Sequence, residues 1–220
     1  MSGPHVPGPA GPVWGRWVGR FLAQGVWATR VVGREHVPTD GPVIFAANHT
    51  GVVDGPILAG VAPRPLHVLV KAEMFTGPIG LVLRGAGQIP VDRASGRSAL
   101  AAALGVLQRG GAVGVFPEGN RGRGDVSGAR AGVAWLAVAA DAPVVPVAML
   151  GTRRTGESVG HVPGLRRRVE VTFGEPVRVE RSEGVSRREL TALAAEQIRA
   201  AMAVLVADAA TRTGIALPDA

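Results

Sequence analysis

The sequence predicts an α/β fold in which a mixed, mostly parallel sheet is covered by helices on both faces. Short apolar runs, rich in β-branched residues and too brief for helices, alternate along the chain with longer segments of helical periodicity. Polar residues are almost absent from these runs, which is typical of strands buried on both faces. The clearest runs are Val43 to Ala47, Leu66 to Val70, Ala112 to Phe116 and Val144 to Leu150.

The first 33 residues differ in character from the rest of the chain. Residues 1 to 12 are rich in proline and glycine, so we expect them to be disordered. Residues 13 to 33 place tryptophans and other apolar side chains on one side and arginines on the other, which predicts an amphipathic helix. Two interpretations stay open: the helix packs on the protein's own core, or it lies in a membrane interface. Residues 34 to 220 are expected to form one domain.

The later elements follow from local signals. Helices are predicted over residues 98 to 109, which end at a glycine pair, and over 129 to 140, while 74 to 84 reads as a helix or turn. Short strands are predicted over residues 88 to 91, 169 to 173 and 177 to 179. A last helix is predicted from Arg187 to Ala209, because Ser186 and Glu189 have the spacing of a capping box.

Polar residues follow four of the predicted strands at the point where each strand ends. These residues are His49, Lys71, Arg93 and the segment Glu118 to Arg121. Because the carboxyl ends of parallel strands meet at one edge of a sheet, where ligands usually bind, we expect these side chains to converge. Asp54 lies five positions after His49, and an aspartate beside an imidazole fixes its tautomer and raises its basicity.

Three segments of the chain resemble motifs of the glycerolipid acyltransferases, the 1-acylglycerol-3-phosphate acyltransferase family. They are the His-four-residues-Asp box from His49 to Asp54, the box from Gly87 to Arg93, and the box Phe116-Pro117-Glu118-Gly119-Asn120-Arg121. Two further elements are similar to the family's, the proline-bearing strand Val144 to Ala148 and a Lys-x-Glu element at Lys71. The resemblance covers residues 40 to 175. Asn120 departs from the family's usual threonine, and Pro90 stands where many members carry a large apolar residue.

The resemblance implies a membrane-surface acyltransferase. It would move a fatty acyl group from acyl-CoA or acyl carrier protein to a lysophospholipid, foremost 1-acylglycerol-3-phosphate, giving phosphatidic acid, with no cofactor beyond that thioester donor. Neutral imidazole is the fitting base near pH 7, so His49 is the candidate base and Asp54 its orienting partner. The family treats Glu118 as essential, while the residues alone favour an ion pair with a nearby arginine that holds the loop.

The same chemistry needs groups that bind the phosphate of the acceptor. Arg121 is the first candidate, because a planar guanidinium binds phosphate through two parallel hydrogen bonds, and Lys71 and Arg93 stand behind it. Gly119 allows close approach of an anion to the backbone, and the N–H groups of Gly119 and Asn120 are expected to donate to it.

Composition narrows the classes of partner. The chain carries 24 Lys and Arg against 17 Asp and Glu, a formal charge of +7, which suits a phosphorylated substrate and an anionic membrane surface. No nucleic acid is expected, since the chain has no tyrosine and few phenylalanines for base stacking. The histidines lack the spacing of metal ligands, so no metal is expected. With no evident membrane-spanning segment or secretory signal, we predict a peripheral protein on the cytoplasmic face of the membrane.

Several alternatives stay open at this point. An enzyme of the same class acting on glycerol-3-phosphate or another lysophospholipid is the nearest, and a non-catalytic basic lipid-binding protein comes from a different class. A serine hydrolase using Ser158, in the G-x-S-x-G match at residues 156 to 160, is the most distant. That motif needs a strand directly before it and a helix directly after it, and neither is predicted. His67 lies inside a predicted strand and reads as a core histidine.

Overall fold

The computed structural model describes residues 5–92, 96–119, 121–126, 131–180 and 184–219. The strands of this part form one sheet in the order β1-β7-β6-β2-β5-β3-β4. Strands β2 to β6 run parallel to one another, β7 is antiparallel to β6, and β1 is parallel to β7, which confirms the predicted mixed, mostly parallel sheet. The strands are β1 (Ala28–Val32), β2 (Val43–Ala47), β3 (Leu66–Lys71), β4 (Ile89–Val91), β5 (Ala112–Val115), β6 (Val144–Leu150) and β7 (Arg168–Phe173).

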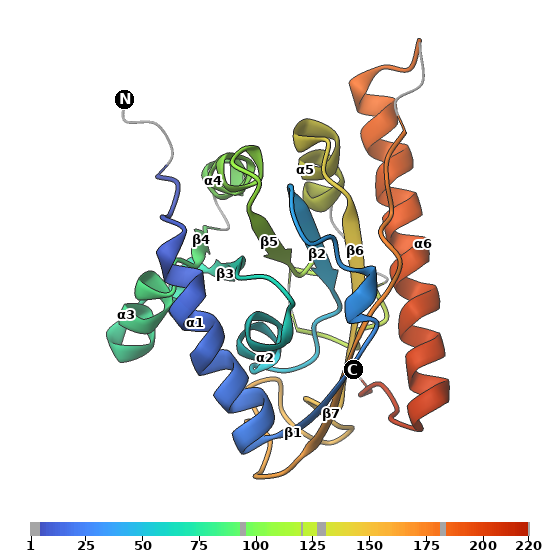
Figure 1. Ribbon diagram of the computed structural model, residues 1–220. Helices are drawn as coiled ribbons and strands as arrows, with labels where there is room; N and C mark the ends of the chain where they lie inside the picture. Colours follow the sequence, from blue (N-terminus) through green and yellow to red (C-terminus); the bar gives the residue numbers. More distant parts are fainter. Residues whose placement is uncertain (1–4, 93–95, 120, 127–130, 181–183, 220) are drawn as a thin grey trace.

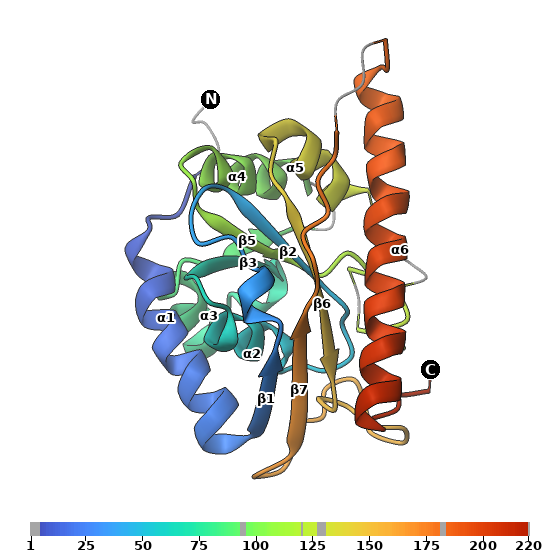
Figure 2. The ribbon, with the colours of Figure 1, turned by 45° about the vertical axis from the view of Figure 1, so that its right-hand side comes forward.

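Helices cover both faces of the sheet, as Figures 1 and 2 show. One face carries α4 (Gly96–Gln108), α5 (Gly132–Ala140) and α6 (Arg187–Thr213), and the other carries α1 (Ala10–Arg20) and α2 (Asp54–Val61), with α3 (Gly77–Gly85) beside α1. Strand β2 shows why both faces need a cover. Ile44 and Ala46 join the core under α4 to α6, whereas Val43, Phe45 and Ala47 join the core under α2.

The N-terminal region differs from its prediction at both ends. The helix α1 begins at Ala10, inside the segment expected to be disordered, and is followed by a π-helical turn over Phe21–Val26. Residues 28 to 32, predicted as the end of the amphipathic helix, form the edge strand β1 instead. Its residues are largely β-branched, and β7 offers an open edge on which Ala28 pairs with Arg168, so extended backbone wins over the helical pattern.

The predicted strand over residues 177 to 179 is also wrong, because only Val177 pairs, with Val144. An antiparallel ladder continued in one direction would need the N–H of residue 146, which is a proline. In the other direction it would need the N–H of Ala142, which donates to the end of α5 at Ala137 O. The other predicted strands and helices are present with slightly shifted ends, and residues 129 and 130 of the helix predicted over 129 to 140 lie outside the described part.

The last helix, α6, begins with the predicted capping box of Ser186 and Glu189 and continues to Thr213. In the described part of the chain it is the one helix with the length and apolar composition to cross a membrane. No membrane-spanning segment was predicted here. Only 28% of its most apolar window is buried. The buried residues, Ala194, Ile198, Met202, Val206 and Ala209, recur at helical spacing and face the core of the sheet.

Two glycines allow α1 to lie directly against α2. A Cβ atom on Gly60 would come within 2.1 Å of the carbonyl carbon of Gly19, and one on Gly19 would come within 2.5 Å of Pro56 O. Both contacts are with backbone, which cannot move aside as a flexible side chain would. The packing of α1 on the domain therefore depends on the absence of side chains at these two positions.

We predict that Gly60→Ala lowers the free energy of unfolding by about 1–3 kcal/mol, because the added methyl group forces the two helices apart. Urea denaturation followed by circular dichroism measures this difference. Gly164→Ala is the matched control, since a Cβ there meets nothing within 4 Å, and its effect should stay within about 0.5 kcal/mol. Equal effects of the two substitutions would contradict backbone contact between α1 and α2.

Candidate active site

His49 and Asp54 form a hydrogen-bonded pair at the carboxyl end of β2. The Nδ1 atom of His49 lies 2.8 Å from Asp54 Oδ2, and the same oxygen accepts the backbone N–H groups of Thr50 and Gly51 at 2.8 and 2.9 Å. Because a carboxylate oxygen only accepts, Nδ1 carries the proton, and the lone pair of Nε2 is left to act as a base. Asp54 thus turns back toward the preceding loop and does not cap α2, whose N-cap is Val53.

The imidazole is also held from the side. The ring of Phe116, which directly follows β5, stacks on His49 with 4.3 Å between ring centroids and 23° between ring planes. The side chain of His49 keeps 14% of its surface exposed, while Asp54 is fully buried. The imidazole is therefore restrained in orientation and still partly exposed.

Glu118 is joined to the backbone of His49. Its Oε1 accepts the N–H of His49 at 3.2 Å, and in the same loop Gly122 N–H donates to His49 O at 3.0 Å. Burial raises the pKa of Glu118 to about 7, with smaller contributions from the charges of Asp125 and Asp54, although the hydrogen bond from His49 N–H opposes the shift. Within the described part of the chain the hydrogen-bond partners of Glu118 are backbone N–H groups, and Arg130 lies outside that part, so the expected ion pair stays a prediction.

The side chain of Arg153 joins the loops that follow β2, β5 and β6, and no sequence motif marks this residue. This side chain is only 5% exposed, and its guanidinium donates from Nε to Thr50 O at 2.9 Å and from Nη2 to Gly122 O at 2.8 Å. A third bond runs from Nη1 to Glu157 O at 3.3 Å. Because the acceptors belong to the loops after β2, β5 and β6, one buried side chain fixes the spacing among three loops of the site.

Two further residues outside the predictions support the same loop. Asn48 is fully buried and exchanges two hydrogen bonds with the backbone of Met149, at 3.1 and 2.7 Å. The hydroxyl groups of Thr50 and Thr152 lie 2.9 Å apart. Asn48 directly precedes His49, which is a signal that sequence reasoning had available, whereas nothing in the local pattern marks Thr152.

The remaining predicted site residues fall into three groups. Arg121 lies on the same loop as Glu118, and its Nη1 donates to Val159 O at 3.2 Å. Gly119 adopts a positive φ of 69°, and its N–H donates to Phe116 O at 3.0 Å, so this N–H would have to leave that bond to donate to an anion. Lys71 ends β3, beyond β5 from the His49 loop, and is half-buried. Arg93 and Asn120 lie outside the described residues.

Two other predictions concern side chains away from this site. His67 is buried, with Nδ1 2.6 Å from Gly87 O and Nε2 2.9 Å from Nη2 of Arg109, and its pKa is lowered mainly by burial, which confirms a core histidine. Ser158 is exposed in a turn between β6 and β7, without a helix after it. Among the described residues, no three His, Asp or Glu side chains come together as a metal site requires.

We predict that Glu118→Gln stabilises the protein more at high pH than at low pH. A folded-state pKa of about 7 against the ordinary 4.5 means that the folded protein binds a proton which the unfolded chain releases. The stability of the natural protein therefore falls as pH rises from 4.5 through 7, and the variant lacks this loss. We expect its advantage to grow by on the order of 1 kcal/mol over that range, a value reduced by the partial exposure of Glu118.

Urea denaturation of both proteins between pH 4.5 and pH 8 tests this expectation. Glu196→Gln on the outer face of α6 is the control, because hydrogen bonding to Arg199 holds the pKa of that exposed carboxyl below its ordinary value. An advantage of Glu118→Gln that does not change with pH would contradict the burial of an ionisable Glu118.

Comparison with known proteins shows that the chain is similar to acyltransferases. A family model described as Acyltransferase matches residues 28–150. A 1-acyl-sn-glycerol-3-phosphate acyltransferase of Borreliella burgdorferi is 34% identical over 127 residues, which are 56% of this chain and 51% of that protein. The lyso-ornithine lipid O-acyltransferase of Pseudomonas aeruginosa is 30% identical over 216 residues, 89% of this chain and 80% of that protein.

The fold has a counterpart of known structure in the 1-acyl-sn-glycerophosphate acyltransferase PlsC from Thermotoga maritima. That crystal structure matches with a TM-score of 0.67 at 25% identity, over 88% of this chain and 79% of that chain. The chain spans about half the length of the Borreliella relative and 40% of the human 1-acyl-sn-glycerol-3-phosphate acyltransferase beta. Since the family model covers more than half of the residues, and includes His49, Asp54 and Glu118, the chain belongs to the Acyltransferase family.

Proposed function

We propose that this protein transfers a fatty acyl group from a thioester donor, acyl-CoA or acyl carrier protein, to the free hydroxyl of a lysophospholipid. The observation that carries the proposal is the His49–Asp54 pair, in which a buried carboxylate holds the Nδ1 proton and leaves Nε2 open at the edge of the sheet. A base of this kind suits an alcohol that must lose its proton as it attacks.

The proposed reaction follows from that geometry. The hydroxyl oxygen of the acceptor attacks the thioester carbonyl carbon, and its proton passes to Nε2 of His49. Asp54 stabilises the imidazolium that forms. The tetrahedral intermediate then collapses with cleavage of the carbon–sulfur bond, and the departing thiolate takes the proton from Nε2. The products are the ester and a free thiol, and His49 is neutral again.

We propose 1-acylglycerol-3-phosphate as the first acceptor. The Borreliella and human relatives are named for that substrate, and PlsC for the corresponding lysolipid. In this chain Arg121 is the candidate phosphate ligand, because its loop is bound to His49 through Gly122 N–H and because a guanidinium suits a phosphate. Its Nη1 would exchange its bond to Val159 O for a bond to the acceptor.

A second acceptor class is favoured by one specific observation. The relative named as a lyso-ornithine lipid O-acyltransferase aligns with 89% of this chain, whereas the Borreliella relative aligns with 56%. An ornithine headgroup lacks the glycerol phosphate that Arg121 would bind. The two acceptors therefore make opposite demands on Arg121, and the assay below separates them.

The test is release of free thiol by the purified full chain, with acyl-CoA and a panel containing 1-acylglycerol-3-phosphate, lyso-ornithine lipid and lysophosphatidylcholine. We expect one acceptor to stimulate release, and His49→Ala to lower the stimulated rate by about 10²–10⁴-fold, the usual contribution of a general base. Ser158→Ala should match the natural protein. Arg121→Met should weaken use of the phosphate acceptor and spare lyso-ornithine lipid.

Two outcomes would contradict this function. One is a stimulated rate that His49→Ala leaves unchanged. The other is an absence of stimulation by every acceptor, both with acyl-CoA and when acyl carrier protein is the donor, which would favour the non-catalytic lipid-binding protein.

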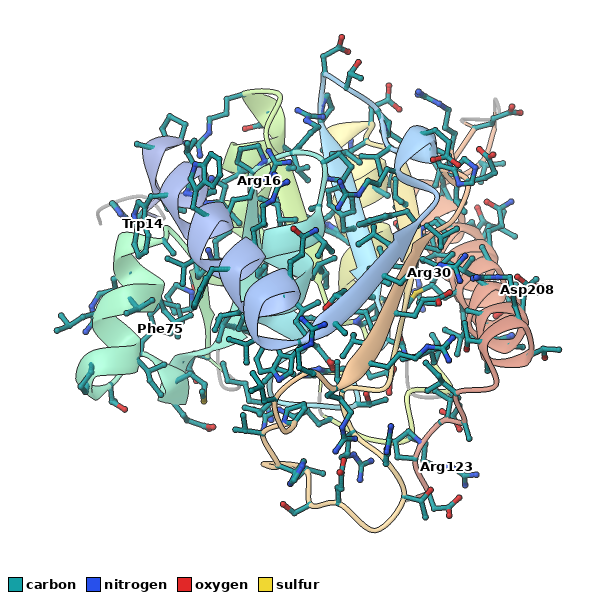
Figure 3. The ribbon with its side chains drawn as sticks, turned by 60° about the horizontal axis from the view of Figure 1, so that its bottom comes forward. Trp14, Arg16, Arg30, Phe75, Arg123 and Asp208 are labelled. Carbon is teal, nitrogen blue, oxygen red and sulfur yellow. The ribbon has the colours of Figure 1, made fainter. Side chains whose placement is uncertain are left out.

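We also propose that the protein works as a peripheral protein on an anionic membrane, on its cytoplasmic face. Trp17 on α1 is 69% exposed, Phe21 at the start of the following π-helical turn is 68% exposed, and Leu81 on neighbouring α3 is 68% exposed. Figure 3 shows Trp14 and Arg16, which also lie on α1. Burial together with the charges of Arg20 and Arg34 lowers the pKa of Arg16, so the local cations repel one another and favour an anionic partner.

We predict that the double substitution Trp17→Ser and Phe21→Ser weakens sedimentation with anionic vesicles at least tenfold, because two large side chains no longer enter the lipid. Deletion of the N-terminal residues is unsuitable, since α1 packs on α2 and β1 belongs to the sheet. Leu193→Ser, at a 57% exposed position on α6, is the control. Unchanged sedimentation of the double variant would contradict membrane contact by α1.

A further inference from the structure

The loop between β6 and β7, residues 151–167, is tied down and yet presents apolar side chains to solvent. Trp27 Nε1 donates to Pro163 O at 3.0 Å, and Arg166 N–H donates to Val26 O at 2.8 Å. Arg166 adopts a positive φ of 60°, a conformation that costs energy for a residue other than glycine. These two hydrogen bonds therefore fix the loop to Val26 and Trp27.

Three apolar side chains of this loop are nevertheless exposed to solvent. Val159 is 50% exposed, Val162 is 62% exposed and Leu165 is 75% exposed. An exposed aliphatic side chain on its own needs no explanation, but three on one restrained loop expose apolar surface that water solvates poorly. We call these three residues the loop patch.

The charge around the loop patch is positive. Residues 151 to 168 contain five arginines and one glutamate, so the segment carries a net charge of +4. The glutamate, Glu157, already pairs with Arg167 and lies 3.3 Å from His161 Nε2, whereas Arg154, Arg166 and Arg168 are exposed. The facing loop adds Arg121, bound to Val159 O, and Arg123, whose Nε lies 3.8 Å from Asp125 Oδ2. Figure 3 shows Arg123 beside this loop.

The loop patch is connected to the candidate active site by direct contacts. Arg121, which bonds Val159 O, follows Glu118 on the loop after β5. Arg153, at the start of the patch loop, donates to Thr50 O beside His49. A partner seated on the patch would therefore lie against the loop that carries Glu118 and Arg121.

We propose that the loop patch is a second membrane contact, separate from α1, in which Val159, Val162 and Leu165 enter the headgroup boundary of an anionic membrane. Arg154 and Arg166 then lie against lipid phosphates. The aliphatic side chains of the loop patch suit the apolar interior of the membrane, and the nearby arginines suit its anionic headgroups. A second copy of this chain fits less well, because two such cationic rims would repel each other. A role in delivering the acceptor to His49 rests on the acyl-transfer function proposed above.

Site-specific fluorescence tests the contact directly, because the chain has no cysteine and one can be placed at will. Leu165→Cys is labelled with nitrobenzoxadiazole and mixed with vesicles of phosphatidylcholine containing 30 mol% phosphatidylglycerol. Val204→Cys, on the outer face of α6 and 70% exposed, is the matched control, because α6 is the rival apolar surface. We expect a blue shift and at least a twofold rise in emission at position 165, with neither at position 204.

Either of two results would overturn the proposal: no spectral change at position 165 while the protein sediments with the vesicles, or an equal change at both positions. In a second arm, Val162→Ser with Leu165→Ser should weaken vesicle sedimentation at least fivefold, and a melting temperature within a few degrees shows that the variant folds. Sedimentation equal to that of the natural protein would also overturn the proposal.

Thiol release separates this inference from the function on which its delivery role rests. With acceptor embedded in vesicles, the double serine variant should lose at least fivefold in rate, whereas a short-chain acceptor dissolved as monomers should be used as well as before. An equal loss with both acceptors would place the patch in the reaction itself and overturn the docking role. If the natural protein releases no thiol, the proposed function fails, and the fluorescence result still decides the membrane contact.

Discussion

The buried carboxylate of Asp54 is the constraint on which the candidate site depends. A charge removed from water costs several kcal/mol unless hydrogen bonds replace its hydration. One oxygen, Oδ2, receives all three available N–H groups, while Oδ1 has no partner among the described residues. The loop after β2 must therefore curl around Oδ2. The same contacts fix the position of the imidazole and its tautomer. The shape of this loop and the orientation of His49 therefore depend on one carboxylate.

This curled loop is stable only because it is fixed to its neighbours. Arg153 reaches carbonyl oxygens of three separate loops, which a guanidinium does with its fan of N–H donors and a lysine cannot do in the same plane. Gly51 completes the fit, because a Cβ there would lie 3.0 Å from Thr152. The motifs thus supply the reacting groups, and residues outside the motifs hold those groups at their working distances.

The sequence was sufficient for features with a local cause. Strand β2 and helix α6 were predicted because hydrophobic runs and a capping box are written in consecutive residues, and convergence of His49, Asp54 and Glu118 followed from the parallel sheet. Strand β1 was missed because its partner, β7, lies more than 130 residues away, and no pattern within residues 28 to 32 announces that pairing. Arg153 was missed for the same reason. An arginine next to another arginine reads as exposed until the three carbonyl groups around it are seen.

The pKa of Glu118 is a property of the candidate site that the sequence motif alone does not predict. Burial holds its pKa near 7, so the free protein at neutral pH carries this carboxyl partly protonated. In the proposed reaction His49 takes a proton, and the positive charge that appears on the residue whose backbone N–H Glu118 accepts favours the ionised form of Glu118. Glu118 is then best stabilised as a carboxylate when the imidazolium exists. Under the acyl-transfer function proposed above, a group whose ionised form is disfavoured in the resting site is better accommodated in the charged state of His49, and such a difference between states is what would lower a barrier.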